Sequence, residues 1–364
     1  MKIKVNRKEL SKHISIVQKA ISPRTTMQIL EGILIIAKDN TLTLIASDEK
    51  LSIKSKLSAV VEEDGNYVVN SRLFGEIIRR LQDDIVNISV NQNNMHISAN
   101  KSEFDIQVQN SEEFPDLPKI DNESTVTINS EDFKEAVRKT SFAVSLDETR
   151  KNFTGVFMNV VQGSINFVAL DGFRMALKSI RSGCEENISV IIPARALNEI
   201  GKIIEEEEDI KVDVSFNQIK FTLANTEVYT TRISGEFFNY EGLIRNDHTS
   251  IVKTKREDIE NSLERASLLA KEEKANLIKL DISGENILIT SNSEIGSVKE
   301  EVAAQIEGED LKIAFNSKYL LEGIKNMTGE NLTFNFTDSV NPCIIKEDED
   351  PDYIYLVLPV RLAN

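Results

Sequence analysis

The sequence predicts an α+β protein made of three repeated domains, each with two helices on antiparallel sheets. The first observation behind this prediction is a helix start that recurs at Asn70, Pro193 and Asn316, at intervals of 123 residues in a chain of 364. Each of these positions follows a strand-like pattern and precedes apolar residues at helical spacing. A landmark that recurs with a fixed period indicates repeated structural units.

A second landmark repeats with nearly the same period. The segments that begin at Asn6, Ser130 and Thr254 each read as a helix start, again followed by apolar residues at helical spacing. Units of this length are ordinary domain sizes. The predicted domains are residues 1–122, 123–248 and 249–364.

Paired strands with alternating apolar residues follow the first helix of each repeat, and short polar turns between them indicate hairpins. These pairs are 32–37 with 41–46, 156–161 with 164–170, and 277–282 with 286–290. A third strand is expected next, as at 51–57 and 175–180. Three more strands follow the second helix, as at 85–90, 95–99 and 104–108, and at 210–216, 219–223 and 228–233. Proline and charged residues place linkers at 112–119 and 245–249.

Charged residues are unevenly distributed between the predicted helices and the rest of the chain. The formal net charge of −16 argues at first against a polyanionic partner. The six predicted helices nevertheless carry 19 basic and 11 acidic residues, a net charge of +8, which leaves −24 for the rest. One such helix is usually just a solvated face. Six that share the bias predict contacts to phosphates, which carry no sequence information and weaken with salt.

The chain lacks sequence motifs for catalysis or cofactor binding. Gly201-Lys202 is followed by Ile203 and lacks the glycine pattern of a P-loop, and no dinucleotide-binding glycine motif occurs. The three histidines are expected in a helix, a strand and a linker, where a structural role is common. Carboxylate runs such as 205–209 read as solvated surface. We therefore expect no catalytic residues, no cofactor and no metal site.

Two further patterns concern the cellular compartment. Cys184 and Cys343 lie in different repeats without metal-ligand spacing, so both are expected to be reduced. The first residues contain no apolar run of signal-peptide length, and 18 apolar residues never occur together. These patterns predict a cytoplasmic protein with no membrane partner.

Four segments, in order along the chain, resemble the bacterial DNA polymerase III beta subunit family, the sliding clamps. They are Arg24–Leu30, Ala169–Ala176, Gly235–Tyr240 and Tyr355–Leu362. The resemblance covers the whole length. It implies a head-to-tail homodimer whose DNA-clamp domains form a closed ring around double-stranded DNA without sequence specificity. It also implies a non-catalytic processivity factor of the DNA polymerase III holoenzyme, with three further partners: the replicative DNA polymerase, the clamp loader and other proteins that carry a clamp-binding motif.

On the DNA side, the expected contacts are basic residues of the helices and of one loop in the first two repeats. They are Arg24, Arg72, Arg79, Arg80, Lys134, Arg138, Arg150, Lys151 and Arg195.

The segment Asp171-Gly172 reads by itself as a tight hairpin turn. The resemblance adds that this turn forms part of a hydrophobic pocket where partner peptides bind, a concave apolar site suited to short hydrophobic peptides. The implied pocket residues are Phe153, Leu170, Gly172, Phe173, Arg174, Met175, Phe238, Leu243, Asn316, Tyr319, Ser339, Leu356, Val357, Leu358, Pro359, Val360, Arg361 and Leu362. Phe173 and Phe238 depart from the residues usual in the family, which predicts an altered peptide preference.

Residues 103–109 alternate apolar and polar and predict an edge strand. Such an edge pairs with another edge near 296–302 of a second copy, or is an ordinary protected edge. The resemblance implies Phe104 and Ile106 against Leu268 and Leu269 of the partner, and Lys101 facing Glu300 or Glu301.

Two other functions stay open as alternatives. A repeat scaffold that binds only proteins predicts no salt-dependent affinity for circular DNA. A carboxylate-dependent hydrolase predicts a deep cleft with two carboxylates about 5–10 Å apart and catalytic turnover.

Overall fold

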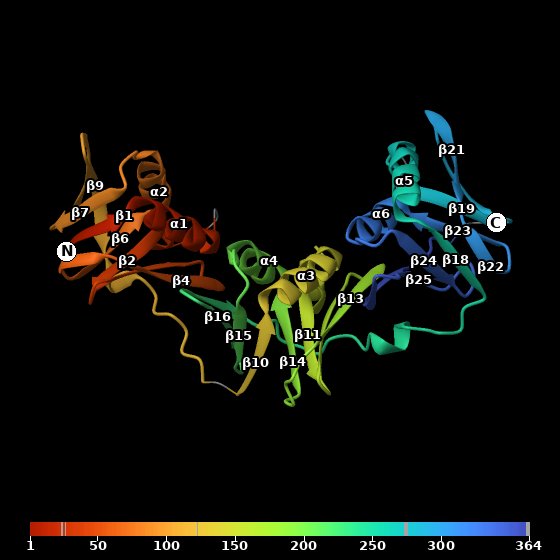
Figure 1. Ribbon diagram of the computed structural model, residues 1–364, viewed down its shortest axis with the longest axis horizontal. Helices are drawn as coiled ribbons and strands as arrows, with labels where there is room; N and C mark the ends of the chain where they lie inside the picture. Colours follow the sequence, from red (N-terminus) through yellow and green to blue (C-terminus); the bar gives the residue numbers. More distant parts are fainter. Residues whose placement is uncertain (23–24, 26, 122, 273–275, 362–364) are drawn as a thin grey trace. The chain divides into compact units, whose positions relative to one another are not determined.

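The computed structural model describes residues 1–22, 25, 27–121, 123–272 and 276–361 (Figure 1). It contains two compact units, residues 1–131 with 199–232 and residues 132–198 with 233–364, which we describe separately. The predicted site residues Arg24 and Leu362 lie outside the described residues.

The first unit contains one long antiparallel sheet with two helices of the first repeat. Its helices are α1 (Arg7–Val17) and α2 (Ser71–Arg80). Its strands are β1 (Lys2–Asn6), β2 (Gly32–Lys38), β3 (Thr41–Ser47), β4 (Leu51–Ser58), β5 (Val60–Glu63), β6 (Gly65–Asn70), β7 (Ile85–Asn91), β8 (Asn94–Ala99), β9 (Ser102–Asn110), β10 (Ser124–Asn129), β15 (Asp209–Val214), β16 (Gln218–Leu223) and β17 (Thr226–Thr231).

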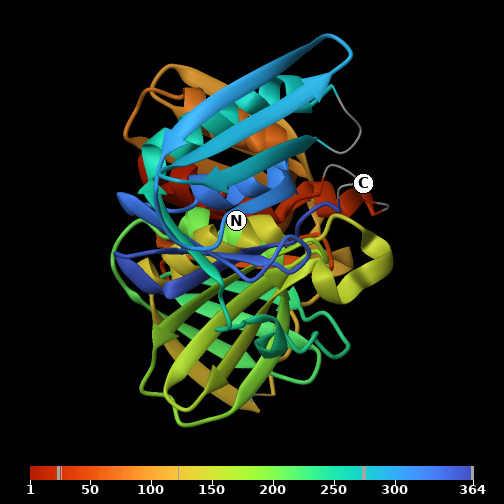
Figure 2. The ribbon, with the colours of Figure 1, turned by 90° about the vertical axis from the view of Figure 1, so that its right-hand side faces the viewer.

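The second unit contains a nine-stranded and a four-stranded sheet. Its helices are α5 (Arg256–Ala270), which packs on β20 and β21 (Figure 2), and α6 (Ser317–Lys325). Helices α3 (Ser130–Thr140) and α4 (Ala194–Ile203) belong partly to each unit. The strands are β11 (Gly155–Val161), β12 (Ser164–Leu170), β13 (Arg174–Arg181), β14 (Ile188–Pro193), β18 (Ser250–Lys255), β19 (Leu277–Ser283), β20 (Asn286–Ser293), β21 (Gly296–Ala303), β22 (Gln305–Gly308), β23 (Leu311–Asn316), β24 (Asn331–Phe336), β25 (Cys343–Glu347) and β26 (Asp350–Val357).

The recurring helix starts have a local cause. Asn70 and Asn316 are the N-caps of α2 and α6, and their side chains accept hydrogen bonds from Leu73 N and Lys318 N. Pro193 immediately precedes α4. An N-cap side chain satisfies a backbone donor that the helix itself leaves unpaired. The helix starts predicted from the repeat are therefore confirmed.

One prediction about the helices needs correction, and two short strands were not predicted. With the observed bounds, the six helices carry 15 basic and 11 acidic residues, and α5 carries two basic against four acidic ones. The predicted basic bias of all six helices is wrong, because Lys19, Lys253, Lys255 and Lys271 lie just outside the regular helices. The short strands β5 and β22 were also not predicted, since four residues give too little periodicity.

Strand pairing joins the first two repeats into one sheet. Strand β4 of the first repeat pairs antiparallel with β17 of the second, with Ile53 opposite Val228. On the same strands Lys54 Nζ donates to Glu227 at 2.9 Å. The hydroxyls of Ser55 and Thr226 lie 2.7 Å apart in the buried face. We call this pairing the first seam.

A second seam joins the second and third repeats. Strand β13 pairs antiparallel with β26, with Met175 opposite Leu356, so the nine-stranded sheet runs through both repeats. Counted after the first helix of each repeat, β4 and β13 are third strands, and β17 and β26 are the last strands of their repeats. Both seams therefore pair the third strand of one repeat with the last strand of the next, and they are equivalent connections.

A buried cluster of charged residues lies beside the second seam. Lys139 Nζ of α3 donates to Glu347 and, at 2.5 Å, to Asp350 Oδ2, and all of the Lys139 side chain is buried. Lys178 Nζ donates to Asp350 Oδ1 at 2.6 Å. Burial by itself lowers the pKa of Lys139, but the hydrogen bonds and charges of Asp350 and Glu347 outweigh it and raise that pKa. The ammonium group therefore stays charged and ties α3 to the third repeat.

None of the helices in the described part of the chain has the length and hydropathy needed to cross a bilayer.

Replacing Lys139 by Met is expected to lower the free energy of unfolding by about 3–5 kcal/mol, because it leaves buried carboxylates without their partner. Urea denaturation followed by circular dichroism measures this loss. Lys202→Met is the matched control, since its ammonium is largely exposed beside Glu199, and it should change stability by less than about 0.5 kcal/mol. Equal losses in both variants would contradict the structural role of the buried cluster.

Candidate functional site

Several of the predicted pocket residues form one hydrophobic cluster at the second seam. Leu170, Met175 and Leu356 are buried there, and Phe153 and Leu243 pack against them while staying partly accessible. Met175 and Leu356 meet because they are opposite each other in the register of β13 and β26. The sheet pairing thus forms the floor of the predicted pocket from two repeats.

An aromatic residue that the sequence analysis missed completes this cluster. The Phe237 ring stacks on Phe157 at a centroid distance of 4.7 Å and meets Phe153 edge-on at 6.2 Å. The neighbouring Phe238, which was predicted, is 48% exposed. Two adjacent phenylalanines in the sequence indicate that one of them packs inward, but the sequence does not indicate which one.

The predicted turn at Asp171-Gly172 is confirmed. Asp171 Oδ1 accepts hydrogen bonds from Phe173 N at 2.9 Å and Arg174 N at 3.1 Å. Gly172 has φ of +93°, which a residue with a side chain rarely adopts. Asp48 makes the same two bonds to Lys50 N and Leu51 N in the first repeat. The turn is therefore shared by the first two repeats.

The guanidinium group of Arg174 is held in place by several neighbouring residues. Its guanidinium donates to Asp171 Oδ2 at 3.1 Å, to Phe142 O at 3.0 Å and to Glu322. The guanidinium carbon lies 4.7 Å from the ring centroid of Tyr319, a cation–π distance. The side chain is only 7% exposed. Arg174 therefore serves as a rigid support beneath Tyr319.

Phe173 also packs against Tyr319. The two rings are nearly parallel, with centroids 5.8 Å apart, and Phe173 is 56% exposed. Burial, followed by the charge of Asp171, raises the pKa of the Tyr319 hydroxyl, so this group is a neutral hydrogen-bonding group. The stack is an accessible aromatic surface on a charged support.

A cavity of about 250 Å³ opens beside this stack and is lined by Phe173, Arg174, Tyr319, Leu146 and Arg150 among others. Arg150 was predicted to contact DNA. The structure places its Nη1 3.1 Å from the position that a Cβ on Gly172 would occupy, at the cavity wall. Its contact with DNA stays a prediction.

The chain after β26 returns to the same region. Leu358 N donates to Phe173 O at 2.8 Å, and Val360 N donates to Ala314 O at 2.7 Å. Leu358 is 36% exposed, whereas Val357 is fully buried. The remaining predicted pocket residues are half-buried or exposed: Pro359, Asn316, Ser339 and Arg361. Asn316 is occupied as an N-cap, and nothing described ties Ser339 to the cluster.

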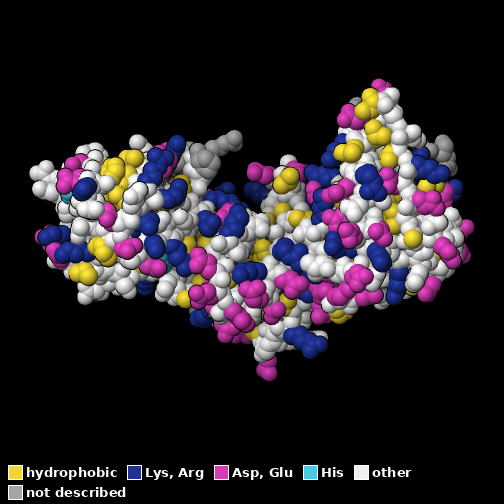
Figure 3. Space-filling model, turned by 45° about the horizontal axis from the view of Figure 1, so that its top comes forward, with side chains coloured by type: hydrophobic (Ala, Val, Ile, Leu, Met, Phe, Trp, Pro, Cys, Tyr) yellow, Lys and Arg dark blue, Asp and Glu magenta, His cyan; other side chains and the backbone are white. Residues whose placement is uncertain are grey.

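The residues predicted to contact DNA are dispersed. Arg72, Arg79 and Arg80 are exposed on α2, and Arg72 is paired with Glu76 on the same helix. Arg138 Nη1 donates to Asn326 O at 2.9 Å. Half-buried Lys134 and exposed Arg195 lie on α3 and α4, and exposed Lys151 lies in the 3-10 helix Glu148–Phe153 before β11. Figure 3 shows Lys and Arg side chains interspersed with Asp and Glu on the face in view.

The residues predicted for the dimer contact lie on β9 and the turn before it, on β21 and on α5. Phe104 is 38% and Leu268 is 66% exposed, and hydrophobic side chains gather over α5 and β21 in Figure 3. Ile106 and Leu269 are half-buried, and Lys101 and Glu301 are exposed. Glu300 is engaged by Arg265 Nε at 3.0 Å within its own chain.

Strand β21 is the edge of its sheet, as predicted. The prediction that β9 is an edge strand needs correction. Its last residues pair with β6, so the unpaired edge is limited to residues 102–107. The cause is a fork between β9 and β6 that the alternating pattern does not reveal.

Among the described residues, no group of three or more His, Cys, Asp or Glu is arranged to hold a metal ion.

Comparison with known proteins gives a match for each repeat. Three family models match, described as the N-terminal, central and C-terminal domains of the DNA polymerase III beta subunit, over residues 1–118, 127–239 and 242–361. The beta sliding clamp of Bacillus subtilis (strain 168) is 34% identical over 99% of this chain and 100% of that protein.

Solved structures agree over the full length. The crystal structure of the DNA polymerase sliding clamp from Bacillus subtilis has 32% sequence identity and a TM-score of 0.96, and the comparison covers 100% of both chains. The structure of the DNA polymerase III beta subunit from Thermotoga maritima has 28% identity and a TM-score of 0.93 with the same coverage. The predicted fold class of three repeated domains is confirmed.

The Arg174 support suggests a stability test. Arg174→Gln removes the charge that Asp171 and Glu322 face, and is expected to cost about 2–4 kcal/mol of unfolding free energy. Urea denaturation measures it. Arg245→Gln is the control, because Arg245 pairs with Asp247 on the exposed surface, where such pairs contribute about 0–1 kcal/mol. If Arg174→Gln is as stable as its control, Arg174 is no rigid support.

Proposed function

This chain belongs to the DNA polymerase III beta subunit family, and we propose that two copies close head to tail into a ring-shaped sliding clamp around duplex DNA. Its full-length relatives are named sliding clamps, and the chain is accordingly a processivity factor of DNA replication. In the proposed ring it is a non-catalytic cytoplasmic subunit that tethers the replicative polymerase. The clamp loader and other clamp-binding proteins are its further proposed partners.

The observation that carries the ring is the repetition of one connection. The third strand of the first repeat pairs with the last strand of the second, and the third strand of the second pairs with the last strand of the third. One such pair of edges is then left, β21 and the free part of β9. Exposed strand edges favour pairing with another chain. Applying the same connection between two copies joins β21 of each to β9 of the other.

The hydrophobic contact at this junction supports closure. Four apolar side chains, Phe104, Ile106, Leu268 and Leu269, are available to be covered, and each contributes roughly 1.5–3 kcal/mol on burial. The cost of association is about 4–15 kcal/mol. Two junctions that close together, with backbone hydrogen bonds at each, therefore favour a closed homodimer.

We propose that the contacts between this protein and DNA are electrostatic and independent of the base sequence. The exposed arginines of α2 (Arg72, Arg79 and Arg80) are the best supported group, since helix-borne cations that contact phosphates hold a duplex without reading bases. Binding of this kind permits sliding. A net charge of −16 on the whole chain limits attraction to phosphates elsewhere.

For partner proteins we propose a peptide site at the second seam. The cluster of Leu170, Met175 and Leu356 supplies an apolar floor, and the Phe173–Tyr319 stack supplies an accessible aromatic wall. A concave apolar site with few polar anchors suits a short hydrophobic peptide. Phe173 makes this wall aromatic on its outer face, which favours peptides with an aromatic or flat apolar residue at that position.

The ring has a topological consequence that tests the proposal. Protein loaded by a clamp loader onto nicked circular DNA should stay bound, and should be released when a restriction enzyme linearises the circle. Retention is measured by gel filtration of labelled protein. Equal release from circular and linear DNA would reject encirclement, and failure to bind DNA at any salt concentration would favour the protein-only scaffold.

The peptide site has a separate test. Phe173→Ala is expected to weaken binding of a polymerase-derived peptide about 10-fold, because an accessible aromatic anchor is a common hot spot. Isothermal titration measures the affinity. Phe216→Ala is the matched control, since Phe216 is 74% exposed outside this site. Unchanged affinity in both Phe173→Ala and a deletion of residues 358–364 would assign the peptide to another surface.

A further inference from the structure

The end of helix α6 is held by an arginine from the preceding repeat. Arg138 Nη1, on α3, donates to Asn326 O at 2.9 Å, and Asn326 is the C-cap residue of α6. The last carbonyl groups of a helix have no partner inside the helix. A basic side chain that donates to them stabilises the helix end. Arg138 of the second repeat therefore completes a helix of the third repeat.

A second contact from α3 secures the loop that follows α6. Lys139 Nζ donates to one carboxylate oxygen of Glu347. The other oxygen, Glu347 Oε2, accepts hydrogen bonds from Thr328 N at 2.7 Å and Gly329 N at 2.6 Å. Arg138 and Lys139 thus hold the end of α6 and the start of its loop, one directly and one through a buried carboxylate. This end of the helix is fixed to α3.

The same helix carries two residues of the proposed peptide site. Tyr319 stacks with Phe173, and Glu322 accepts a hydrogen bond from the guanidinium of Arg174. Positions 319, 322 and 326 are spaced i, i+3 and i+7, so they lie on one face of the helix. Each of the three contacts the second repeat. One face of α6 is therefore attached to the second repeat along its length.

The position of α6 depends on these attachments. The helix has nine residues, and isolated helices of this length are marginal in water. Asn326 lies seven residues after Tyr319, roughly 10 Å along the helix axis. Between them, Gly323 lies so close to the Tyr355 ring that a Cβ on it would be 2.0 Å from Cε1. Because α6 touches β26 at this point, a displacement of its C-terminal end tilts the helix and moves Tyr319.

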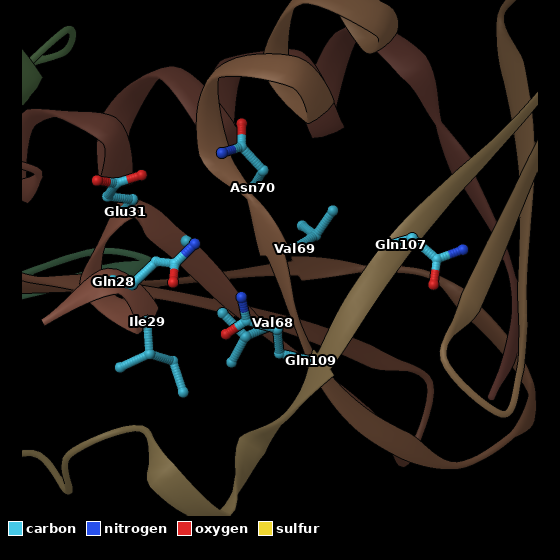
Figure 4. A pocket seen from close by; sticks show the side chains of 9 residues that line it. Gln28, Ile29, Glu31, Val68, Val69, Asn70, Gln107 and Gln109 are labelled. Carbon is cyan, nitrogen blue, oxygen red and sulfur yellow. The ribbon is translucent and has the colours of Figure 1, made fainter.

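The second helix of the first repeat shows what the third repeat adds. Figure 4 labels Asn70, the N-cap of α2, which is the second helix of its repeat as α6 is of the third. After α2, Arg7 Nε donates to Asp83 O at 3.0 Å, and the equivalent Arg256 makes the same kind of bond after α6. Each of these bonds joins two segments of one repeat. The bond from Arg138 is additional and comes from a neighbouring repeat.

A serine takes the place of Arg138 in the first repeat. Arg138 is the ninth residue of α3, and the ninth residue of α1 is Ser15. The hydroxyl of Ser15 donates to Ser11 O of its own helix at 2.9 Å. The arginine therefore occurs at the seam that carries the proposed peptide site, whereas the first seam has a side chain too short to bridge two helices.

We propose that Arg138 is a positioning residue of the peptide site, a role that rests on the proposed function of that site. Arg138 acts through α6: by holding the end of the helix, it keeps Tyr319 and Glu322 in contact with the second repeat. The site is thereby preorganised, which favours binding because the peptide has less of the site to order. Contact with DNA, which was predicted for Arg138 from its charge, is then not its role.

Peptide affinity measures this role. Arg138→Gln should weaken binding of the fluorescein-labelled polymerase-derived peptide about fivefold in fluorescence anisotropy titrations, because the end of α6 is released. Arg138→Lys keeps a charged donor for the helix-end carbonyl and should return the affinity to within about twofold of the original. Lys325→Gln is the matched control on the same helix. Its ammonium pairs with Glu264 of α5 at 2.6 Å in its own repeat, where both groups are about half exposed, so the affinity should change by less than about twofold.

A tryptophan reports on the aromatic stack directly. The chain contains no tryptophan, so Phe173→Trp places a single indole beside Tyr319. Adding Arg138→Gln should shift the emission to longer wavelength and lower its anisotropy, since the indole gains solvent exposure and mobility. Adding Arg138→Lys should leave both close to the values of the single variant. The spectra are recorded where urea denaturation shows every variant to be folded, so a loss of stability alone does not change them.

DNA binding separates this role from a phosphate contact. The affinity for a labelled duplex falls with salt, and the loss of one phosphate contact lowers the slope of log affinity against log salt by roughly 0.9. Arg138→Gln should keep the slope of the original chain. Arg79→Gln removes an exposed arginine of α2 and should reduce the slope while peptide affinity stays unchanged.

The outcomes distinguish this proposal from the proposed function. Unchanged peptide affinity in Arg138→Gln, or unchanged emission when it is added to Phe173→Trp, overturns the positioning role. A reduced salt slope in Arg138→Gln also overturns it and assigns the arginine to DNA. If the original chain binds no peptide, the proposed peptide site fails, and the tryptophan emission alone decides whether Arg138 positions α6.

Discussion

The need of strand edges for backbone hydrogen-bond partners is the constraint on which this structure depends. Each repeat ends in a strand that pairs along one edge with the preceding strand of its own repeat, and its other edge also needs a partner. The second and third repeats satisfy that strand with the third strand of the preceding repeat, at the seams of β4 with β17 and β13 with β26. Sheets therefore run continuously through neighbouring repeats, and side chains from two repeats meet at defined register positions.

The proposed peptide site follows from the second seam. Met175 and Leu356 come together because they face each other across it. The turn at Asp171 then places Phe173 and Arg174 at the end of the seam, next to Tyr319 of α6. Buried charges stabilise the same region, since Lys139, Lys178, Asp350 and Glu347 satisfy one another at the side of β26. The proposed peptide site thus lies at a seam that buried charges and strand pairing hold rigid.

Much of this arrangement was readable from local patterns, for a physical reason. Helix capping by Asn70 and Asn316, the Asp171 turn and two-residue alternation in the strands are decided within a few residues. Three features could not be predicted from local patterns, because each depends on residues distant in sequence. They are the inward packing of Phe237 rather than Phe238, the separation of β9 from β6, and the position of Arg150 at the cavity wall. The basic bias assigned to all six helices failed because helix ends were placed a few residues too far out, where lysines gather.

The sequence by itself determined the number of repeats, the order of their strands and helices and, through its resemblance, the family. These depend on period, capping and turn chemistry, which act over short distances. Only the tertiary structure decided which edges remain open, how the strands are aligned across the seams, and which charged residues are already paired within the chain. Register is a relation between segments that lie far apart in sequence, and it is fixed by the packing of whole sheets.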